Sequence, residues 1–332
     1  GNTLYLRATD GTNGYELWKS DGTASGTVMV SDINSGSGSS SGPGGLIVAG
    51  TTLFFDANDG TNGRELWALD PANITGLSSG SSSSSASAYA NNKVGVGELH
   101  TCAILDNGDV KCWGFNQHGQ LGNGATSLFA QNTPSSTAID LGTGRTAVAL
   151  SSGWYHTCAI LDNGDLKCWG SDTDGQLGDG GINTHTNAPS STAIDLGTGR
   201  TAVAVSGGEK HTCAILDNGE LKCWGDDGYG QMGIGSSSNI DLSAPSSNAI
   251  DLGTGRTAVA VSAGKGYTCA ILDNGDLKCW GKNDEGQLGI GTNAELNAPP
   301  STSINLGTGR TAVAVSAGGF HTCAILDNGD LK

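Results

Sequence analysis

A stretch of fifteen residues constrains this chain most, because it occurs five times. The sequence HTCAILDNGDLKCWG at 156–170 returns with few changes from His100, His211, Tyr267 and His321, and the last copy is incomplete. The first cysteines of successive copies lie 54 to 56 residues apart. A fixed period of this length identifies a repeat protein, so each motif has to be interpreted as part of a shared unit.

Each copy has the composition of two strands joined by a tight Asp-Asn-Gly turn. A two-residue loop would place Cys158 and Cys168 on opposite faces of the hairpin. A three-residue loop, with Gly164 in the left-handed conformation, places them directly opposite each other and puts Ile160 and Leu166 on the same face. The sequence therefore predicts a three-residue loop and four cross-strand disulfides: Cys102–Cys112, Cys158–Cys168, Cys213–Cys223 and Cys269–Cys279.

The nine cysteines indicate the compartment of the protein. Zinc is the competing interpretation, but ten residues across a hairpin with no second cysteine pair nearby is not the spacing of metal ligands. Disulfides need an oxidising compartment, so we expect an extracellular or cell-surface protein. The sequence contains no transmembrane run, begins at Gly1 and ends inside a repeat, which predicts an excerpt of a longer exported chain.

Composition favours an all-β fold and argues against some partners. Only 36% of the 332 residues are hydrophobic and 55 are glycine, a mixture typical of short strands and many turns. The formal net charge is −16, with a pI near 4.5. Because an acidic surface repels phosphate groups, we expect no nucleic-acid partner and no direct insertion into membranes.

A different repeat occupies residues 1–72. GTNGYELW at 11–18 recurs as GTNGRELW at 60–67, and an alternating strand precedes each copy. The sequence ELWKSDGT at 16–23 resembles the E-L-W-x-x-D-G-T repeat family of exported proteins, which implies β-propeller blades; the second copy lacks the Gly-Thr. A Ser/Gly-rich connector follows at 73–93, and it begins with Asn73, the acceptor of a weak N-glycosylation sequon.

Residues 94–332 contain the five hairpin repeats, each with about four predicted strands. The pattern W-G-x-x-x-x-G-Q-L-G at 113–122 and 169–178 closely resembles the regulator of chromosome condensation repeat family. That resemblance implies a seven-bladed β-propeller with blades of four short antiparallel strands. Two E-L-W units and five hairpin units would supply seven blades, so the whole chain is expected to form one closed ring, or else a ring left open at the fifth unit.

No catalytic constellation stands out, and we expect a protein without enzymatic activity, metal or cofactor. The recurrent histidines could suggest a metal ring, but Tyr267 takes the fifth position, which favours packing or hydrogen bonding. Calcium is the alternative at 172–175, where Asp-Thr-Asp-Gly has part of a calcium-loop pattern. The tryptophans at 113, 169, 224 and 280 share one repeat position and are expected to pack in or between blades.

Positions that differ between copies indicate a binding face. They are the pair before each histidine or Tyr267 and the loop after each Trp-Gly, and the hairpin register places both at one end of every hairpin. The predicted binding residues are the aromatic ones at these positions: Phe115, Trp154, Tyr155, Tyr229 and Phe320.

We therefore predict an exported protein-binding, glycan-binding or surface-display module. The alternatives are a structural spacer of a large cell-surface protein and, from the family resemblance, an inhibitor of a secreted enzyme. The guanine-nucleotide exchange known in the family fits poorly with disulfides and acidity.

Overall fold

The computed structural model describes residues 4–20, 22–34, 39–49, 52–58, 64–69, 93–235 and 241–332. These residues form twenty-one β-strands and, within the described ranges, no helix, which confirms the all-β prediction. Contacts divide the chain into unit 1, Gly1–Ala86, and unit 2, Ser87–Lys332. Within the described ranges, no helix is long and apolar enough to cross a membrane.

Unit 1 contains the same hairpin twice. Each E-L-W segment forms the second strand of an antiparallel pair, with Trp18 opposite Leu6 in one copy and Trp67 opposite Phe55 in the other. Both residues of the pair are shifted by 49 positions from one copy to the other, so the two hairpins have the same pairing register. The strands are β1 (Leu4–Ala8), β2 (Glu16–Ser20) and β3 (Val28–Ser31) in one sheet, and β4 (Gly44–Ala49), β5 (Thr52–Asn58) and β6 (Arg64–Leu69) in the other.

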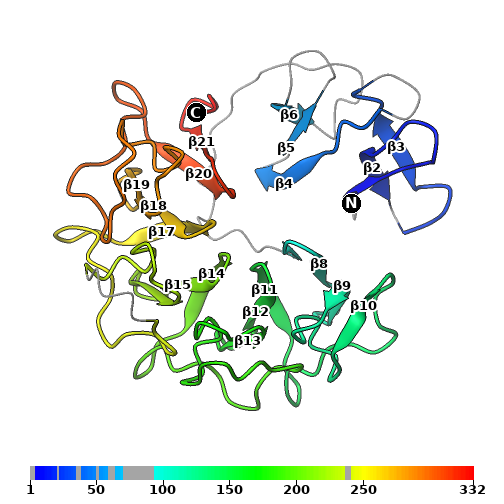
Figure 1. Ribbon diagram of the computed structural model, residues 1–332, viewed down its shortest axis with the longest axis horizontal. Helices are drawn as coiled ribbons and strands as arrows, with labels where there is room; N and C mark the ends of the chain where they lie inside the picture. Colours follow the sequence, from blue (N-terminus) through cyan, green and yellow to red (C-terminus); the bar gives the residue numbers. More distant parts are fainter. Residues whose placement is uncertain are drawn as a thin grey trace. The chain divides into compact units, whose positions relative to one another are not determined.

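Unit 2 is a series of five small antiparallel sheets that follow one another along an arc (Figure 1). The first has four strands in the order β10-β9-β8-β7, three sheets have three strands, and the last has two. In the three-stranded sheets a single bridge stands where the first sheet has β10, as between Gly170 and Thr186. The strands are β7 (Val94–Val96), β8 (His100–Ile104), β9 (Val110–Asn116), β10 (Ser127–Gln131), β11 (Ala147–Ser152), β12 (His156–Leu161), β13 (Leu166–Gly170), β14 (Ala202–Gly207), β15 (His211–Leu216), β16 (Leu221–Gly225), β17 (Ala258–Ala263), β18 (Tyr267–Leu272), β19 (Leu277–Gly281), β20 (Ala312–Ala317) and β21 (Thr322–Leu326).

The hairpin register agrees with the sequence prediction. Cys158 lies opposite Cys168, and the last regular pair before the turn is Ile160 with Leu166. Gly164 closes the loop with a φ of 82°, in the left-handed region that glycine adopts without a steric penalty. The same four cysteine pairs that the register predicts are joined by disulfides.

The hydrophobic core lies between neighbouring sheets rather than within one sheet. The cluster that contains the Cys102–Cys112 disulfide, from β8 and β9, also contains Leu161 of β12 and Trp169 of β13. The expected packing role of the repeated tryptophans therefore holds for Trp169, Trp224 and Trp280, which are fully buried. Trp113 in the first sheet of unit 2 is only half-buried. A sheet of this kind is stabilised by its neighbour, as in other repeat proteins.

Candidate functional site

A hydrogen-bonded network repeats between successive sheets of unit 2. The Nε2 atom of His156 lies 2.9 Å from Oγ1 of Thr212 in the next repeat. That hydroxyl donates to the carbonyl oxygen of Gln176 at 2.8 Å, and Nε1 of Trp224 donates to the same oxygen at 3.1 Å. Equivalent histidine-to-threonine contacts are His100–Thr157 and His211–Thr268.

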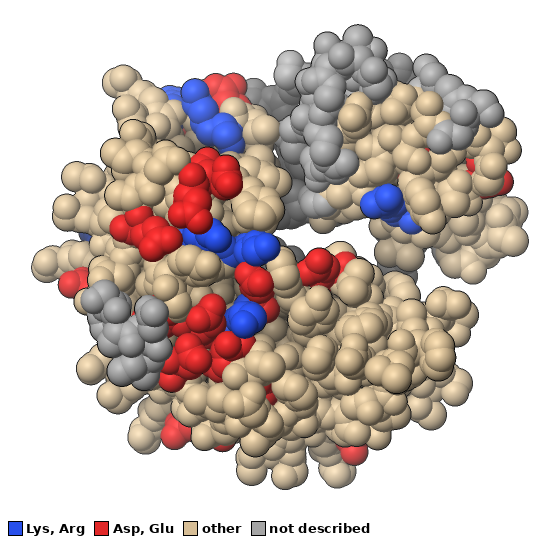
Figure 2. Space-filling view, viewed as in Figure 1, with Lys and Arg blue, Asp and Glu red and all other residues tan. Residues whose placement is uncertain are grey.

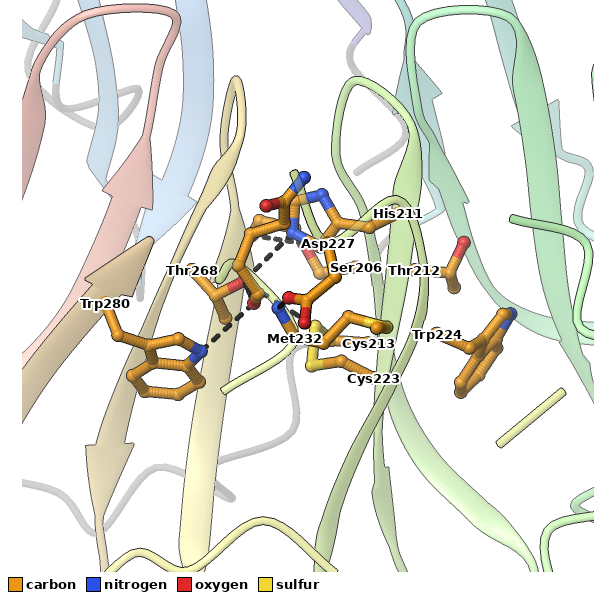
Figure 3. The surroundings of a disulfide bond; sticks show 12 residues. Ser206, His211, Thr212, Cys213, Cys223, Trp224, Asp227, Met232, Thr268 and Trp280 are labelled. Atoms are coloured by element: carbon orange, nitrogen blue, oxygen red, sulfur yellow. Dashed lines mark hydrogen bonds between the residues drawn. A yellow bond between two sulfur atoms is a disulfide. The ribbon is translucent and has the colours of Figure 1, made fainter. Parts of the chain in front are cut away.

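Figure 3 shows one such interface, with His211, Thr268 and Trp280 around the Cys213–Cys223 disulfide.

The direction of these hydrogen bonds fixes the protonation of the buried histidines. Because each threonine hydroxyl donates its proton to a carbonyl, it must accept from the histidine, so the proton lies on Nε2. Among the described residues, the Nδ1 atoms of His100, His156 and His211 have no hydrogen-bond partner, which fits a neutral ring. Burial lowers the pKa of His156 to about 3, with neighbouring histidines adding to the effect, and lowers the pKa of His100 and of His211 to about 4.

Tyr267 performs the same linking role in the fourth repeat. Its hydroxyl donates to the carbonyl oxygen of His321 at 2.5 Å and lies 3.1 Å from Oγ1 of Thr322, whose own proton goes to the carbonyl of Gln287 at 2.8 Å. Burial raises the pKa of Tyr267 to about 12. The exchange of imidazole for phenol therefore preserves a contact between repeats, which agrees with the predicted hydrogen-bonding role of this position.

The positions that vary between repeats lie together, as the register predicts. In the first repeat the N–H of Phe115 donates to the carbonyl of Leu99 at 2.8 Å, and Ser171 pairs in the same way with Tyr155. We call the set of these positions the variable face; it comprises 98–99, 154–155, 209–210, 265–266 and 319–320 before the histidines or Tyr267, and 115–118, 171–174, 226–229 and 282–285 after Trp-Gly.

Backbone hydrogen bonds also join the variable face from one repeat to the next. The N–H of Trp154 donates to the carbonyl of Gly208 at 3.2 Å, and that of Glu209 donates to Gly264. These bonds hold the second repeat against the third and the third against the fourth at this end of the hairpins, so the variable positions of these repeats are neighbours. The Asp-Asn-Gly turns are at the other end of the hairpins.

Three of the five predicted binding residues meet in one cluster. The rings of Phe115 and Tyr155 lie 6.0 Å apart, and Trp154 lies 6.4 Å from Tyr155, measured between ring centroids. All three side chains are half-buried. Two histidines join them, since His118 lies 5.3 Å from Tyr155 and 5.1 Å from His185. We call these five residues the aromatic patch.

The other two predicted residues lie outside this cluster and contact lysines. Phe320 is 54% exposed and Tyr229 is 39% exposed. The ammonium group of Lys265 lies 4.7 Å from the ring centroid of Trp154 and 5.0 Å from that of Phe320, so it links the second repeat to the fifth. Lys282 lies 4.6 Å from the ring of Tyr229. These are cation–π distances.

Carboxylates crowd the variable face near the third repeat. Figure 2 shows acidic side chains gathered around basic ones over the sheet of β14–β16. The described members that influence one another are Asp174, Glu209, Asp226, Asp227 and Asp241, which we call the acidic patch. Burial and the neighbouring Asp226 raise the pKa of Glu209, Asp227 and Asp241.

Asp227 differs from its counterparts in the other repeats. Asn116 and Asn283 occupy the same place and donate their amides to backbone carbonyls, and the Asp172 carboxylate accepts from Thr184 at 2.8 Å. In Asp227, Oδ1 accepts from the N–H of Met232, but Oδ2 has no hydrogen-bond partner among the residues that the structure describes, although Asp227 is only 2% exposed. Its pKa is raised to about 6, chiefly by burial.

Calcium at 172–175 finds little support in the geometry. The carboxylate of Asp172 is occupied by the N–H of Leu177 and the hydroxyl of Thr184, while Asp174 pairs with Lys210 at 3.4 Å. Within the described ranges, no three His, Cys, Asp or Glu side chains are placed to share a metal ion. The predicted glycosylation acceptor Asn73 lies outside the described residues.

The opposite end of the hairpins is uniform. An arginine and an aspartate pair there in four repeats, as Arg200 and Asp217 do at 3.2 Å. Side chains that recur in successive repeats serve the shared scaffold. The differences between repeats therefore lie at the variable face rather than at the turns.

Comparison with known proteins defines the class. The Regulator of chromosome condensation (RCC1) repeat matches residues 92–120, 147–176, 202–231 and 258–287 in one description of the repeat, and 107–160, 163–215 and 274–325 in a second. The protein is an all-β chain of propeller type, and it belongs to the RCC1 repeat family.

This chain matches its curated relatives over only part of their length. The chain is 31% identical to the ultraviolet-B receptor UVR8 of Arabidopsis thaliana over 62% of this chain and 44% of that protein. It is 28% identical to the human E3 ubiquitin-protein ligase HERC2 over 70% of this chain and 5% of the ligase. The chain therefore spans less than half the length of these relatives.

Solved structures agree on the fold. Yeast RCC1 (Prp20), seen bound to Kap60, matches with a TM-score of 0.59 and 20% identity, over 72% of this chain and 54% of that one. Human WBSCR16 matches with a TM-score of 0.61 and 16% identity, over 98% of this chain and 84% of that one. At these identities the likeness concerns the propeller fold alone.

Proposed function

We propose that the chain is an exported, non-catalytic binding module whose protein or glycan partner docks on the variable face. One observation carries the proposal: the repeats share their scaffold residues and differ at one end of the hairpins, where aromatic rings from different repeats gather. Residues that the shared scaffold does not require can vary between repeats to suit a binding partner. Half-exposed aromatic side chains are also the usual anchors of binding interfaces.

The disulfides support export. Each of the four closes a hairpin within a single repeat, and thiols in the cytosol would remain reduced. We therefore place the protein outside the cell or at its surface. The two E-L-W hairpins and the five hairpin repeats are proposed to form one ring of seven blades, with four strands in a complete blade; β10 would represent the outermost strand.

A capture experiment tests the binding function. The immobilised chain would be exposed to proteins and glycans from its native surroundings, beside a variant with Phe115→Ser and Tyr155→Ser. A control variant would carry Asn163→Ser and Asn274→Ser in the turns at the opposite end. We expect the first variant to retain its melting temperature and bind its partner at least about tenfold more weakly, and the control to bind normally.

Equal capture by the wild type and both variants would contradict the role of the variable face. Capture of no partner by the wild type would favour the alternative function, a structural spacer of a cell-surface protein.

A further inference from the structure

We propose that the partner presents a basic peptide segment, with an Arg or Lys side chain entering the acidic patch while adjoining residues pack on the aromatic patch. This inference rests on the proposed binding function and specifies its ligand. A flexible, positively charged segment of another protein is the ligand class that the charges and rings of this face fit.

The charge balance of the face is the first support. Lys210 pairs with Asp174 at 3.4 Å and Lys282 with Asp284 at 3.3 Å, so these two lysines are already neutralised. Glu209 is attracted by Lys265 and Lys210 as well as repelled by Asp226, whereas Asp226 and Asp241 repel each other and both repel the Asp227 carboxylate. An incoming cation would relieve this repulsion, whereas an anionic ligand would increase it.

The unpartnered oxygen of Asp227 is the second support, and it is independent of the charge count. A buried carboxylate oxygen without a hydrogen bond is costly, and such groups in native proteins call for an explanation. The same position in the first and fourth repeats is satisfied by an asparagine amide. A guanidinium or ammonium group bound beside Asp226 and Asp241, the two carboxylates that act on Asp227 electrostatically, would stabilise the charged form of the buried Asp227 carboxylate from outside.

The third support is that rings on this face already bind cations. Lys265 lies against both Trp154 and Phe320, and Lys282 lies against Tyr229. Within the described ranges, Phe115 and Tyr155 have no such cation–π contact. Their partly exposed faces are therefore available to a side chain of the ligand. Trp154 connects them to the acidic patch, because Lys265, which lies against its ring, also acts on Glu209.

Peptide binding provides the test. The probe is a fluorescein-labelled peptide of alternating Arg and Ser, compared with the same peptide containing citrulline, which is neutral and has nearly the same shape. The face variant carries Glu209→Gln, Asp226→Asn and Asp241→Asn. The matched control carries Asp165→Asn, Glu220→Gln and Asp276→Asn, which remove the same charge from the turns at the opposite end.

We expect the wild type and the control to bind the Arg peptide alike, within about twofold. The face variant should bind about tenfold more weakly, because several contacts between charges are lost together. The citrulline peptide should bind to none of them. A single Asp227→Asn exchange, which restores the residue of the first and fourth repeats, should also weaken the Arg peptide several-fold while leaving the fold intact.

Equal losses in the face variant and the control would overturn the proposal, because they would show attraction by net charge alone. Binding of the citrulline peptide as tight as that of the Arg peptide would overturn it too. If the Arg peptide fails to bind but Phe115→Ser with Tyr155→Ser still abolishes capture of a natural partner, the binding function stands and only the basic ligand class is wrong.

Discussion

At the scale of single residues, the same amino acid has different duties in different repeats. Trp169 is fully buried between two sheets, where its Nε1 donates to the backbone carbonyl oxygen of Gln120, whereas Trp113 at the corresponding position is half-buried. Trp154 lies outside the repeat pattern and contacts Lys265. Full burial marks Trp169 as a scaffold residue, whereas the proposed binding role belongs to the half-buried Trp154.

Alanine substitution should distinguish these duties. Trp169→Ala should lower the free energy of unfolding by about 3 to 5 kcal/mol, the usual cost of deleting a buried aromatic ring. Trp113→Ala, its matched control, should cost clearly less because part of that ring is already exposed. Trp154→Ala with Tyr155→Ala should change stability little and weaken capture of the partner. Denaturant unfolding measures the stability of all three variants, and the capture experiment measures binding. A folding defect confined to the Trp154 variant would reverse our assignment of core and surface.

The buried histidines predict a loss of stability in acid. Their pKa values are lowered in the folded protein, to about 4 for His100 and His211 and to about 3 for His156, while an unfolded chain keeps a value near 6.5. Below pH 6.5 the unfolded state therefore binds protons that the folded state cannot. Stability should be full above pH 6.5 and fall steadily down to about pH 4.

Urea unfolding between pH 8 and pH 4 measures this loss. His156→Gln serves as the comparison, because an amide can still donate toward Thr212 but does not titrate. Its stability should change less with pH than that of the wild type. An equally steep pH dependence in both proteins would show that other groups cause the acid sensitivity.

Asp227 should give stability a pH dependence of the opposite sign to that of the histidines. Its pKa is raised to about 6 in the folded protein, so its contribution to stability is full below its ordinary pKa near 3.8 and is lost as the pH rises through 6. Asp227→Asn should therefore raise the melting temperature at pH 7 and change it little at pH 4. Asp172→Asn is the control, since the Asp172 carboxylate already accepts from Thr184 and gains less from the exchange. No rise at pH 7 would mean that Oδ2 is satisfied in solution.

At the scale of the hairpin, two local signals were sufficient to predict the structure. The cysteine pair and the alternation of Ile160 and Leu166 each require a three-residue loop, and the pairing of Cys158 with Cys168 follows from it. Because every repeat presents the same pair of signals, the prediction also placed Phe115 and Leu99 at one end of the hairpin. Strand register is well specified wherever one face must be buried.

The site itself was only partly predictable, because it forms between repeats. His185 comes to His118 from a loop of the next repeat, and Lys265 reaches Trp154 and Phe320 from yet another. The spacing of residues within one repeat cannot predict these contacts between repeats. His118 could be noticed in the sequence only because it is a histidine in a loop that varies between repeats. The unsatisfied oxygen of Asp227, among the described residues, is seen only in the structure.

The disulfide of one hairpin can be tested without disturbing the others. Replacing Cys158 and Cys168 together by Ala should reduce the free energy of unfolding by about 2 to 3 kcal/mol, the value expected for so short a loop. Non-reducing peptide mapping of the wild type should recover each cysteine pair as a linked fragment. Four pairs of free thiols in the mature protein would contradict both the hairpin disulfides and the proposed export.

At the scale of the whole molecule, all nine cysteines lie in unit 2, since the first of them is Cys102. Reduction should therefore weaken unit 2 directly. If the two units complete one ring, as proposed, each terminal sheet depends on its neighbour, and the β1–β2 and β5–β6 hairpins of unit 1 should lose stability as well. Hydrogen exchange followed by mass spectrometry, with and without a reductant, measures each hairpin separately. We expect faster exchange in both units after reduction; faster exchange in unit 2 with unchanged protection in unit 1 would show that the units fold independently and that the seven-bladed ring is wrong.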